Sequence, residues 1–292
     1  VTWSRCRRRP TSLGGFSSLS PPPQPHAYPE DSTSLATASL LTVRSSLGDY
    51  QNDIVLVGGL VPKFICNNPP DALPAVTRDV DRGIALGASG GQYGTLSSHL
   101  QGVGFKRDGM RFRRDLKGLT IFVDFLTEAE KSGQTSAMVD DVAVSSFPGI
   151  NRALALHRTV SVTGKDVFGG QQTCPVKVCE VGPFLVLKLN AFVHRQQPKD
   201  AFDVYKTVLH FDGGVAEAAK GFRAESDINS GFRVASETLR THFSNIDGSG
   251  PTRCAEFMIG GLQGQMPVGD FDIRRDQIRE EMVGVAELLG HK

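Results

Sequence analysis

The sequence predicts an α+β fold in which a domain with a mixed β-sheet comes first and a mainly helical domain follows. Up to residue 181, short apolar and β-branched runs alternate with turns that contain glycine and proline. Beyond that point the apolar residues recur at helical spacing, and Pro183 and Pro198 suit the first turns of helices. We therefore expect a sheet domain at residues 31–181 and a helical domain at residues 182–292.

Residues 1–30 stand apart by composition. They hold six of the 16 prolines, many serines and the run Arg7–Arg9, and no acidic residue comes before Glu30. Such a segment cannot bury enough apolar surface to offset its loss of chain entropy on folding. It is predicted to be a disordered tail or to precede the true start of the protein. Alternatively, the segment is an organelle transit peptide, which it resembles in being rich in arginine and serine and poor in acids.

The spacing of apolar residues predicts each element in turn. A capped helix at 34–47 is followed by a strand at 53–57, which ends in Gly58-Gly59, and by a short helix at 60–65. The elements that follow in the sheet domain are a proline-rich loop at 69–74, a strand at 77–86, a turn at 90–94, a helix at 96–103, a hairpin of strands 110–114 and 119–126 around Lys117-Gly118, a strand at 142–146, a helix at 150–157 and strands at 159–162 and 176–181. The helical domain should contain helices at 183–195 and 198–211 and a helical remainder, 213–289, that glycines interrupt.

Composition excludes several classes of protein. With 39% hydrophobic and 22% charged residues, the chain is not collagen-like, coiled-coil or wholly disordered. A formal net charge of +1 argues against a protein that covers nucleic acid with its whole surface. No apolar run reaches the roughly 20 residues that cross a bilayer, so no membrane partner is expected. Five cysteines without a C-x-x-C pair indicate a reducing, cytoplasmic location with no disulfide or zinc framework.

Asp79 and Asp81 carry the strongest chemical signal. On a strand, alternate side chains point to one face, which places the two carboxylates side by side, about 6–7 Å apart at their Cα atoms. They repel each other unless a cation lies between them, and Mg²⁺ accepts such oxygen ligands. Asp124 is a third acid, alone in the apolar strand Ile121–Leu126, where an unpaired charge would be expensive to bury.

Two acids at this spacing also occur by chance, and a solvated strand edge is the simplest alternative. A calcium-binding loop is excluded, because Gly90 occupies the twelfth position counted from Asp79, where such a loop needs an acid. The order of the features favours a site. A strand ends in Gly58-Gly59, two acids follow about twenty residues later, and a hairpin then delivers a single buried acid.

Four motifs in this order resemble the nucleotidyltransferases of the DNA polymerase β superfamily, and most of all its AbiEii-type toxin branch. The resemblance covers residues 54–211. Its motifs are the Gly58-Gly59 turn, the run Thr77-Arg78-Asp79-Val80-Asp81, the single acid Asp124, and a helical motif made of Lys188-Leu189-Asn190-Ala191-Phe192-Val193-His194-Arg195 followed by Lys199-Asp200-Ala201-Phe202-Asp203.

The resemblance implies a metal-dependent transfer of a nucleoside monophosphate from a nucleoside triphosphate (NTP) such as ATP to an acceptor hydroxyl. Mg²⁺ or Mn²⁺ would be the cofactor, the NTP the co-substrate, tRNA or a protein the acceptor, and a cognate antitoxin a further partner of a toxin-like enzyme. Asp79, Asp81 and Asp124 would hold the metal, and together with Lys188 they would be the catalytic residues. The residues that bind the nucleotide would be Gly58, Gly59, Thr77, Arg78, Lys188, Arg195, Asp200 and Asp203. The alternatives are a small-molecule nucleotidyltransferase and a catalytically inactive nucleotide-binding module.

Read from the residues alone, each group has a functional role and a plainer one. A Gly-Gly turn before a helix lets backbone amides approach phosphate oxygens, although it can equally be a simple strand-to-helix turn. Lys188 and Arg195 share a helix face and could hold a triphosphate as exposed cations, or form a solvated face. Asp200 and Asp203 could orient these cations, or form capping and surface pairs near the start of their helix.

Two features remain outside the motifs. Arg82 stands where the family usually has an aliphatic residue and faces away from the acids, so we expect it at an exposed edge or with its charged end reaching solvent. This departure favours the inactive module to a small degree. A basic cluster could guide an RNA backbone or form a charged strand edge that resists aggregation, and it comprises Lys106, Arg107, Arg111, Arg113, Arg114 and Lys117.

Overall fold

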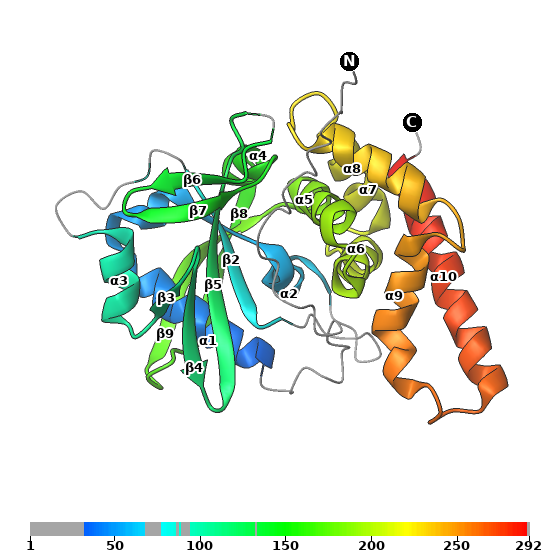
Figure 1. Ribbon diagram of the computed structural model, residues 1–292, viewed down its shortest axis with the longest axis horizontal. Helices are drawn as coiled ribbons and strands as arrows, with labels where there is room; N and C mark the ends of the chain where they lie inside the picture. Colours follow the sequence, from blue (N-terminus) through cyan, green and yellow to red (C-terminus); the bar gives the residue numbers. More distant parts are fainter. Residues whose placement is uncertain (1–31, 68–76, 86–87, 89–93, 132, 291–292) are drawn as a thin grey trace, which may run out of the picture.

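A computed structural model describes residues 32–67, 77–85, 88, 94–131 and 133–290. In this part of the chain a mixed β-sheet with flanking helices comes first and a region made of helices follows (Figure 1). The α+β class, the mixed sheet and the helical C-terminal region are therefore confirmed. The tail at 1–30, the loop at 69–74 and most of the turn at 90–94 lie outside the described residues.

The described strands form one sheet in the order β3-β4-β5-β2-β1-β9-β8, to which β7 is added beside the end of β5, and β6 beside β7. Strand β2 is antiparallel to β1 and parallel to β5, which makes the sheet mixed. The strands are β1 (Ile54–Val57), β2 (Asp79–Ile84), β3 (Lys106–Asp108), β4 (Arg111–Leu116), β5 (Leu119–Thr127), β6 (Ser136–Val139), β7 (Val142–Ser146), β8 (His157–Lys165) and β9 (Gln171–Cys179).

The helices of the second half lie beside the sheet, and the α9–α10 hairpin is farthest from it (Figure 1). Glycines separate α6 from α7, α7 from α8 and α8 from α9, as the broken pattern predicted. No helix in the described residues is both long and apolar enough to cross a membrane. The helices are α1 (Ser32–Ser46), α2 (Pro62–Ile65), α3 (Leu96–Gly102), α4 (Ile150–Ala155), α5 (Val181–Arg195), α6 (Pro198–His210), α7 (Val215–Arg223), α8 (Phe232–Thr238), α9 (Ser249–Ile259) and α10 (Val268–Gly290), with 3-10 turns at Gly48–Asp53, Gly58–Leu60 and Gly260–Leu262 and a π-helical turn at Leu239–Phe243.

Some boundaries differ from the sequence prediction. Strands β3 and β6 were not expected. Strand β3 is exposed throughout and carries no apolar signal, and β6 has only four residues, of which one is buried. The strand expected at 176–181 starts earlier and ends at Cys179, and α5 begins at Val181. The expected start lay after Pro175, because proline cannot donate a ladder hydrogen bond and usually does not lie inside a strand. The structure accommodates it because β9 pairs with β1 only near Val178, which leaves β9 unpaired on that side at Pro175.

Arg82 is buried beneath α1, so the expectation of an exposed position was wrong. The residue is 1% exposed, its Nη2 donates to the carbonyl of Leu40 at 3.1 Å, and its Nε has no hydrogen-bond partner. Burial, together with nearby Arg44, lowers the pKa of this guanidinium to about 9. Strand β2 is central in the sheet, and α1 packs across β2, β5, β8 and β9, so the face of Arg82 is covered.

Replacing Arg82 by methionine should raise the free energy of unfolding by about 1–3 kcal/mol, because an apolar side chain of similar length removes a buried and poorly paired charge. Urea unfolding at pH 7 measures the change. The matched control is Arg240→Met, at a side chain that is 74% exposed, where we expect no measurable change in stability. A clear loss of stability in Arg82→Met would instead show that the guanidinium makes a net favourable contribution.

Candidate functional site

The register of β2 and β5 brings the three predicted acids to one face of the sheet. In this parallel pair Asp81 lies opposite Asp124, and Asp79 lies opposite Phe122. Paired positions on neighbouring strands share a face, so the three carboxylates point the same way, and Val80 points to the opposite face, which α1 covers. Alternation along β2 and pairing with β5 are therefore enough to assemble the cluster.

A tight turn adds a basic residue to this face. Lys117 and Gly118 have φ angles of 50° and 77°, the two positive values that a two-residue type I′ hairpin requires. This turn fixes the register of β4 against β5 so that Arg111 lies opposite Asp124. Arg111 therefore belongs to the acid cluster and not to an exposed RNA-binding surface.

Arg111 bridges two of the three acids. Its Nε and Nη2 donate to the two carboxylate oxygens of Asp124 at 2.7 and 2.6 Å, and Nη2 also donates to Oδ1 of Asp79 at 2.9 Å. The guanidinium carbon lies 4.1 Å from the centre of the Phe122 ring, a cation–π distance. Bidentate pairing of this kind is the strongest form of charge-assisted hydrogen bond to a carboxylate.

The acids remain under mutual repulsion in spite of this bridge. Burial and the carboxylates of Asp124 and Asp79 raise the pKa of Asp81 to about 7, although Lys188 and Arg195 act in the opposite direction. Burial also raises the pKa of Asp124, against the lowering effect of its guanidinium partner. A further positive charge at this face would relieve the repulsion and favour the ionised forms.

The Gly58-Gly59 turn touches the acid cluster. Gly58 has a φ of 74°, and a Cβ on it would lie 1.9 Å from Oδ2 of Asp81. A Cβ on Gly59 would lie 2.5 Å from Nζ of Lys199 and 3.1 Å from Oγ1 of Thr77. Gly58 therefore needs glycine both for space and for its backbone conformation, and a side chain at Gly59 would displace the Lys199 ammonium. Because the helix that follows, α2, has only four residues, its dipole contributes little here.

Two hydrogen bonds that involve backbone groups hold the residues just before β2. Oγ1 of Thr77, a buried side chain, accepts a hydrogen bond from the amide of Asp79 at 3.1 Å. The carbonyl of Arg78 accepts from the amide of Phe122 on β5 at 3.2 Å. Thr77 thus sets the start of the acid-bearing strand, and Arg78 ties it to β5.

Helices α5 and α6 supply a buried network of ion pairs. Nζ of Lys188 lies 2.6 Å from Oδ2 of Asp203 and 3.2 Å from Oδ1 of Asp200. Arg195 and Asp200 form a bidentate pair at 2.6 and 2.8 Å, and Lys199 donates to Asp203 at 2.7 Å. We expected Lys188 to be an exposed cation, and Asp200 and Asp203 either to orient Lys188 and Arg195 or to form surface pairs. The first expectation was wrong, because the Lys188 side chain is only 8% exposed. Both aspartates are buried and paired with these cations, so they do not form surface pairs.

Three cations face two aspartates inside this network, which leaves it with a net positive charge. Burial would raise the pKa of Asp200, but Lys188 and Arg195 outweigh it and lower the pKa to about 2. Oδ2 of Asp203 serves both lysines, whereas its Oδ1 is buried without a hydrogen-bond partner. The network adjoins the sheet, since Nζ of Lys199 lies beside Gly59 and α5 contacts the Gly58–Leu60 turn. The structure therefore brings the sheet acids, the glycine turn and the helical motif into one region.

The donor set of this region fits a hard divalent cation. Three carboxylates from two adjacent strands supply the oxygen ligands that Mg²⁺ and Mn²⁺ prefer. As the side chains stand, however, the described residues contain no group of three His, Cys, Asp or Glu that could hold a metal. Arg111 forms ion pairs with both Asp79 and Asp124.

Sequence reasoning placed Arg111 only in the basic cluster and Lys199 only in the helical motif, and it predicted no contact of either residue with the acids or the glycine turn. A signal for Arg111 existed, because a hairpin centred on Lys117-Gly118 pairs position 111 with position 124. Lys199 was visible only as the basic residue of the helical motif, and its approach to Gly59 is a tertiary contact.

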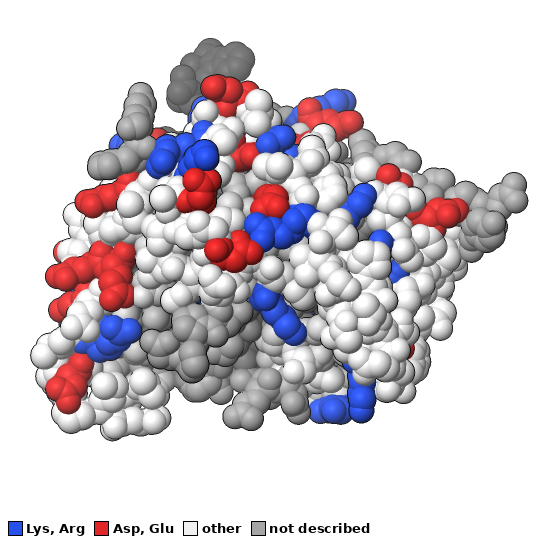
Figure 2. Space-filling view, turned by 180° about the vertical axis from the view of Figure 1, so that it is seen from behind, with Lys and Arg blue, Asp and Glu red and all other residues white. Residues whose placement is uncertain are grey.

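The residues of the basic cluster do not all share one role, since Arg114 donates to the carbonyl of Val103 and its guanidinium lies 4.7 Å from the Phe168 ring. On the face shown in Figure 2, basic and acidic side chains are interspersed over a largely uncharged surface.

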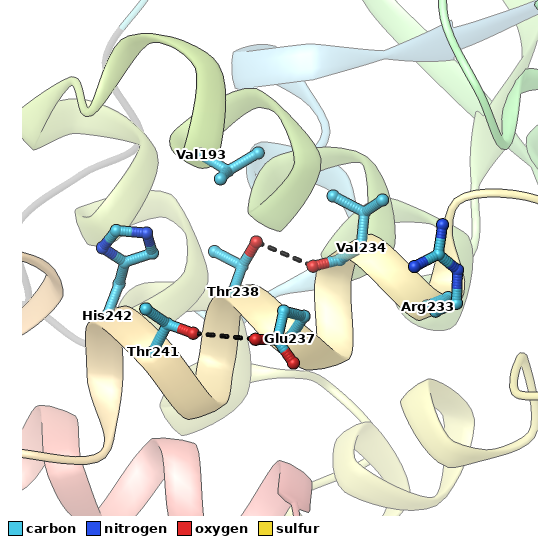
Figure 3. Close-up of a pocket in the computed structure, with 7 residues that line it drawn as sticks. All are labelled: Val193, Arg233, Val234, Glu237, Thr238, Thr241 and His242. Atoms are coloured by element: carbon cyan, nitrogen blue, oxygen red, sulfur yellow. Dashed lines mark hydrogen bonds between the residues drawn. The ribbon is translucent and has the colours of Figure 1, made fainter. Parts of the chain in front are cut away.

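A separate pocket lies on the helical region and contains none of the predicted site residues (Figure 3). Its volume is about 300 Å³, and its walls come from α5, α8 and the π-helical turn. The hydroxyls of Thr238 and Thr241 donate hydrogen bonds to the carbonyl of Val234 and to the carboxylate of Glu237, respectively. The lining residues are Val193, Arg233, Val234, Glu237, Thr238, Thr241 and His242.

No protein-family model matches the chain, and no curated protein matches it. The function of the site therefore has to be inferred from its own geometry and chemistry.

Proposed function

We propose that the protein is a metal-dependent nucleotidyltransferase that moves a nucleoside monophosphate from an NTP to an acceptor hydroxyl. One observation carries the proposal, the meeting of Asp79, Asp81 and Asp124 on one sheet face beside a glycine turn and a network of buried cations. The same residues carry the resemblance to the AbiEii-type branch of the DNA polymerase β superfamily. Geometry and motif order therefore support one function.

Each group has a role that follows from its position. Asp79, Asp81 and Asp124 would hold Mg²⁺ or Mn²⁺, which when bound neutralises phosphate charge and polarises the transferred phosphoryl group. The Gly58-Gly59 turn lies against Asp81 and Lys199, and its backbone amides would be the groups that meet the polyphosphate. Thr77 and Arg78 at the start of β2 and half-exposed Arg195 would also bind the nucleotide. Lys188 would attract the phosphates by its positive charge, and Asp200 and Asp203 would hold it in place.

The reaction itself is a displacement at phosphorus. The acceptor oxygen forms a bond to the α-phosphorus, the bond from that atom to the bridging oxygen of pyrophosphate breaks, and pyrophosphate leaves. The proton of the hydroxyl passes to a carboxylate, for which we propose Asp124, through an oxygen that does not bind the metal. Positioning and charge neutralisation supply most of the rate.

The identity of the acceptor rests on the resemblance alone. It suggests tRNA or a protein hydroxyl, a toxin-like role and a cognate antitoxin, with a small-molecule acceptor as the alternative within enzymes. A catalytically inactive nucleotide-binding module is the second candidate, and the double ion pair of Arg111 favours it, because a guanidinium lies where the metal would be held.

Incubation with each NTP, labelled on its α-phosphate, tests the proposal. Mg²⁺ is supplied with total tRNA in one arm, a protein extract in a second and small hydroxylated metabolites in a third. We expect label in one acceptor fraction and release of pyrophosphate. Saturable nucleotide binding without any labelled acceptor would support the inactive module, and no binding of any NTP would remove both candidates.

A further inference from the structure

Arg111 differs from the other basic residues of its hairpin in what it contacts. It forms three hydrogen bonds to two of the three clustered carboxylates. Arg113 lies two residues further along the same face of β4, and its Nε is 3.8 Å from an oxygen of Asp108, outside the cluster. The two arginines therefore carry the same charge and lie on the same strand, but only Arg111 contacts the proposed metal ligands.

The oxygens that Arg111 uses are those that a metal would need. Both oxygens of Asp124 and one oxygen of Asp79 accept from the guanidinium. A carboxylate oxygen in a charge-assisted hydrogen bond at 2.6–2.9 Å has to give up that bond before it becomes a close ligand of a cation. A guanidinium and a divalent cation therefore compete for the same ligands.

The contacts of Arg111 also allow it to leave. Its side chain is 42% exposed and lies against the face of Phe122, so release does not require a packed core to open. One guanidinium carries a single positive charge, and its hydrogen bonds go to Asp79 and Asp124, two of the three carboxylates. A divalent cation carries twice the charge and would balance the cluster better.

We propose that Arg111 is an internal counter-cation that occupies the three-carboxylate site in the metal-free protein and is exchanged for the divalent cation. The inference rests on the proposed function for the kind of cation. It adds a regulation of that site, in which the free protein binds metal weakly because Arg111 must first be displaced. Arg111 holds Asp79 and Asp124 in place while no metal is bound.

Binding of Mn²⁺ without nucleotide tests the exchange, with free Mn²⁺ measured by electron paramagnetic resonance. Arg111→Met removes the competing charge and keeps a long side chain over Phe122, so we expect it to bind Mn²⁺ about tenfold more tightly than wild type. Arg113→Met is the matched control, since it removes the same charge from the same strand face outside the cluster. Its Mn²⁺ affinity should stay within about twofold of wild type, and equal tightening in both variants would show a general charge effect and overturn the proposal.

Three further outcomes are distinguishable. Equal or weaker Mn²⁺ binding by Arg111→Met would overturn the exchange and leave the proposed function standing, because the readout does not depend on transfer. Failure of every variant and of wild type to bind Mn²⁺ would remove the metal site and the proposed function together. Arg111→Lys keeps a charge without the bidentate geometry, so a smaller gain in affinity supports the exchange even if the methionine variant does not fold.

Discussion

Replacing Asp81 by asparagine is expected to lower the rate of nucleotidyl transfer by about a thousandfold or more while the metal-free protein becomes more stable. The loss follows because the variant lacks one of three metal ligands, and ligand loss at such a site costs several kcal/mol of transition-state stabilisation. The gain follows because asparagine is neutral and ends the repulsion with Asp79 and Asp124. A merely structural aspartate would give the opposite pattern, an unchanged rate with reduced stability.

The pH dependence of the same variant has a defined sign. The pKa of Asp81 is about 7 in the folded protein against an ordinary value of 3.8, so between these values the folded state binds more protons than the unfolded chain. Metal-free wild type should therefore lose stability as the pH rises from about 4 to 7. The asparagine variant lacks this contribution, and its advantage in melting temperature should be largest above pH 7.

Transfer rates at saturating NTP and Mg²⁺, and melting temperatures with a chelator from pH 5 to 8, measure both effects. Asp115→Asn is the control, because Asp115 is an exposed acid of the same hairpin that accepts a hydrogen bond from Thr120 and lies outside the cluster. It should change neither quantity noticeably. Wild-type activity in the Asp81 variant would show that the metal site has been assigned to the wrong residues.

The elements of the sheet domain that carry the site could be predicted from short-range pattern. The apolar run of β1, the alternation of β2 and the turn residues Lys117-Gly118 each report a local preference that the tertiary structure does not override. Strand β3 could not be predicted, because Lys106–Asp108 is exposed throughout and owes its conformation only to pairing with β4. Its pairing partner, and not its own composition, makes it a strand.

The acids of the site were also predictable, whereas their partners were not. Alternation places Asp79 and Asp81 on one face, and this needs no tertiary information. Helical spacing likewise places Lys188 and Arg195 on one face, but it does not say what packs against that face. Lys188 was expected in solvent, and its burial between α5 and α6 depends on Asp200 and Asp203 reaching it from the next helix.

Replacing Asp203 by alanine is expected to destabilise the protein by about 3–5 kcal/mol, which is roughly 10 °C in melting temperature. Asp203 is fully buried, and its Oδ2 is the shared partner of Lys188 and Lys199 at 2.6 and 2.7 Å. Without it, two neighbouring ammonium groups lose the anion between them, and Lys188 keeps only its longer contact with Asp200. An uncompensated buried charge is among the most destabilising consequences of a single substitution.

Thermal and urea unfolding at pH 7 measure this loss, with Glu217→Ala as the control. Glu217 pairs with Lys220 on an exposed helix face, and a surface pair of this kind contributes less than about 1 kcal/mol. Because Lys199 also lies against Gly59, the Asp203 variant should weaken NTP binding even at temperatures where it remains folded. A variant as stable as wild type would mean that the lysines find other partners. A destabilised variant with wild-type NTP affinity would separate the helical network from the nucleotide site.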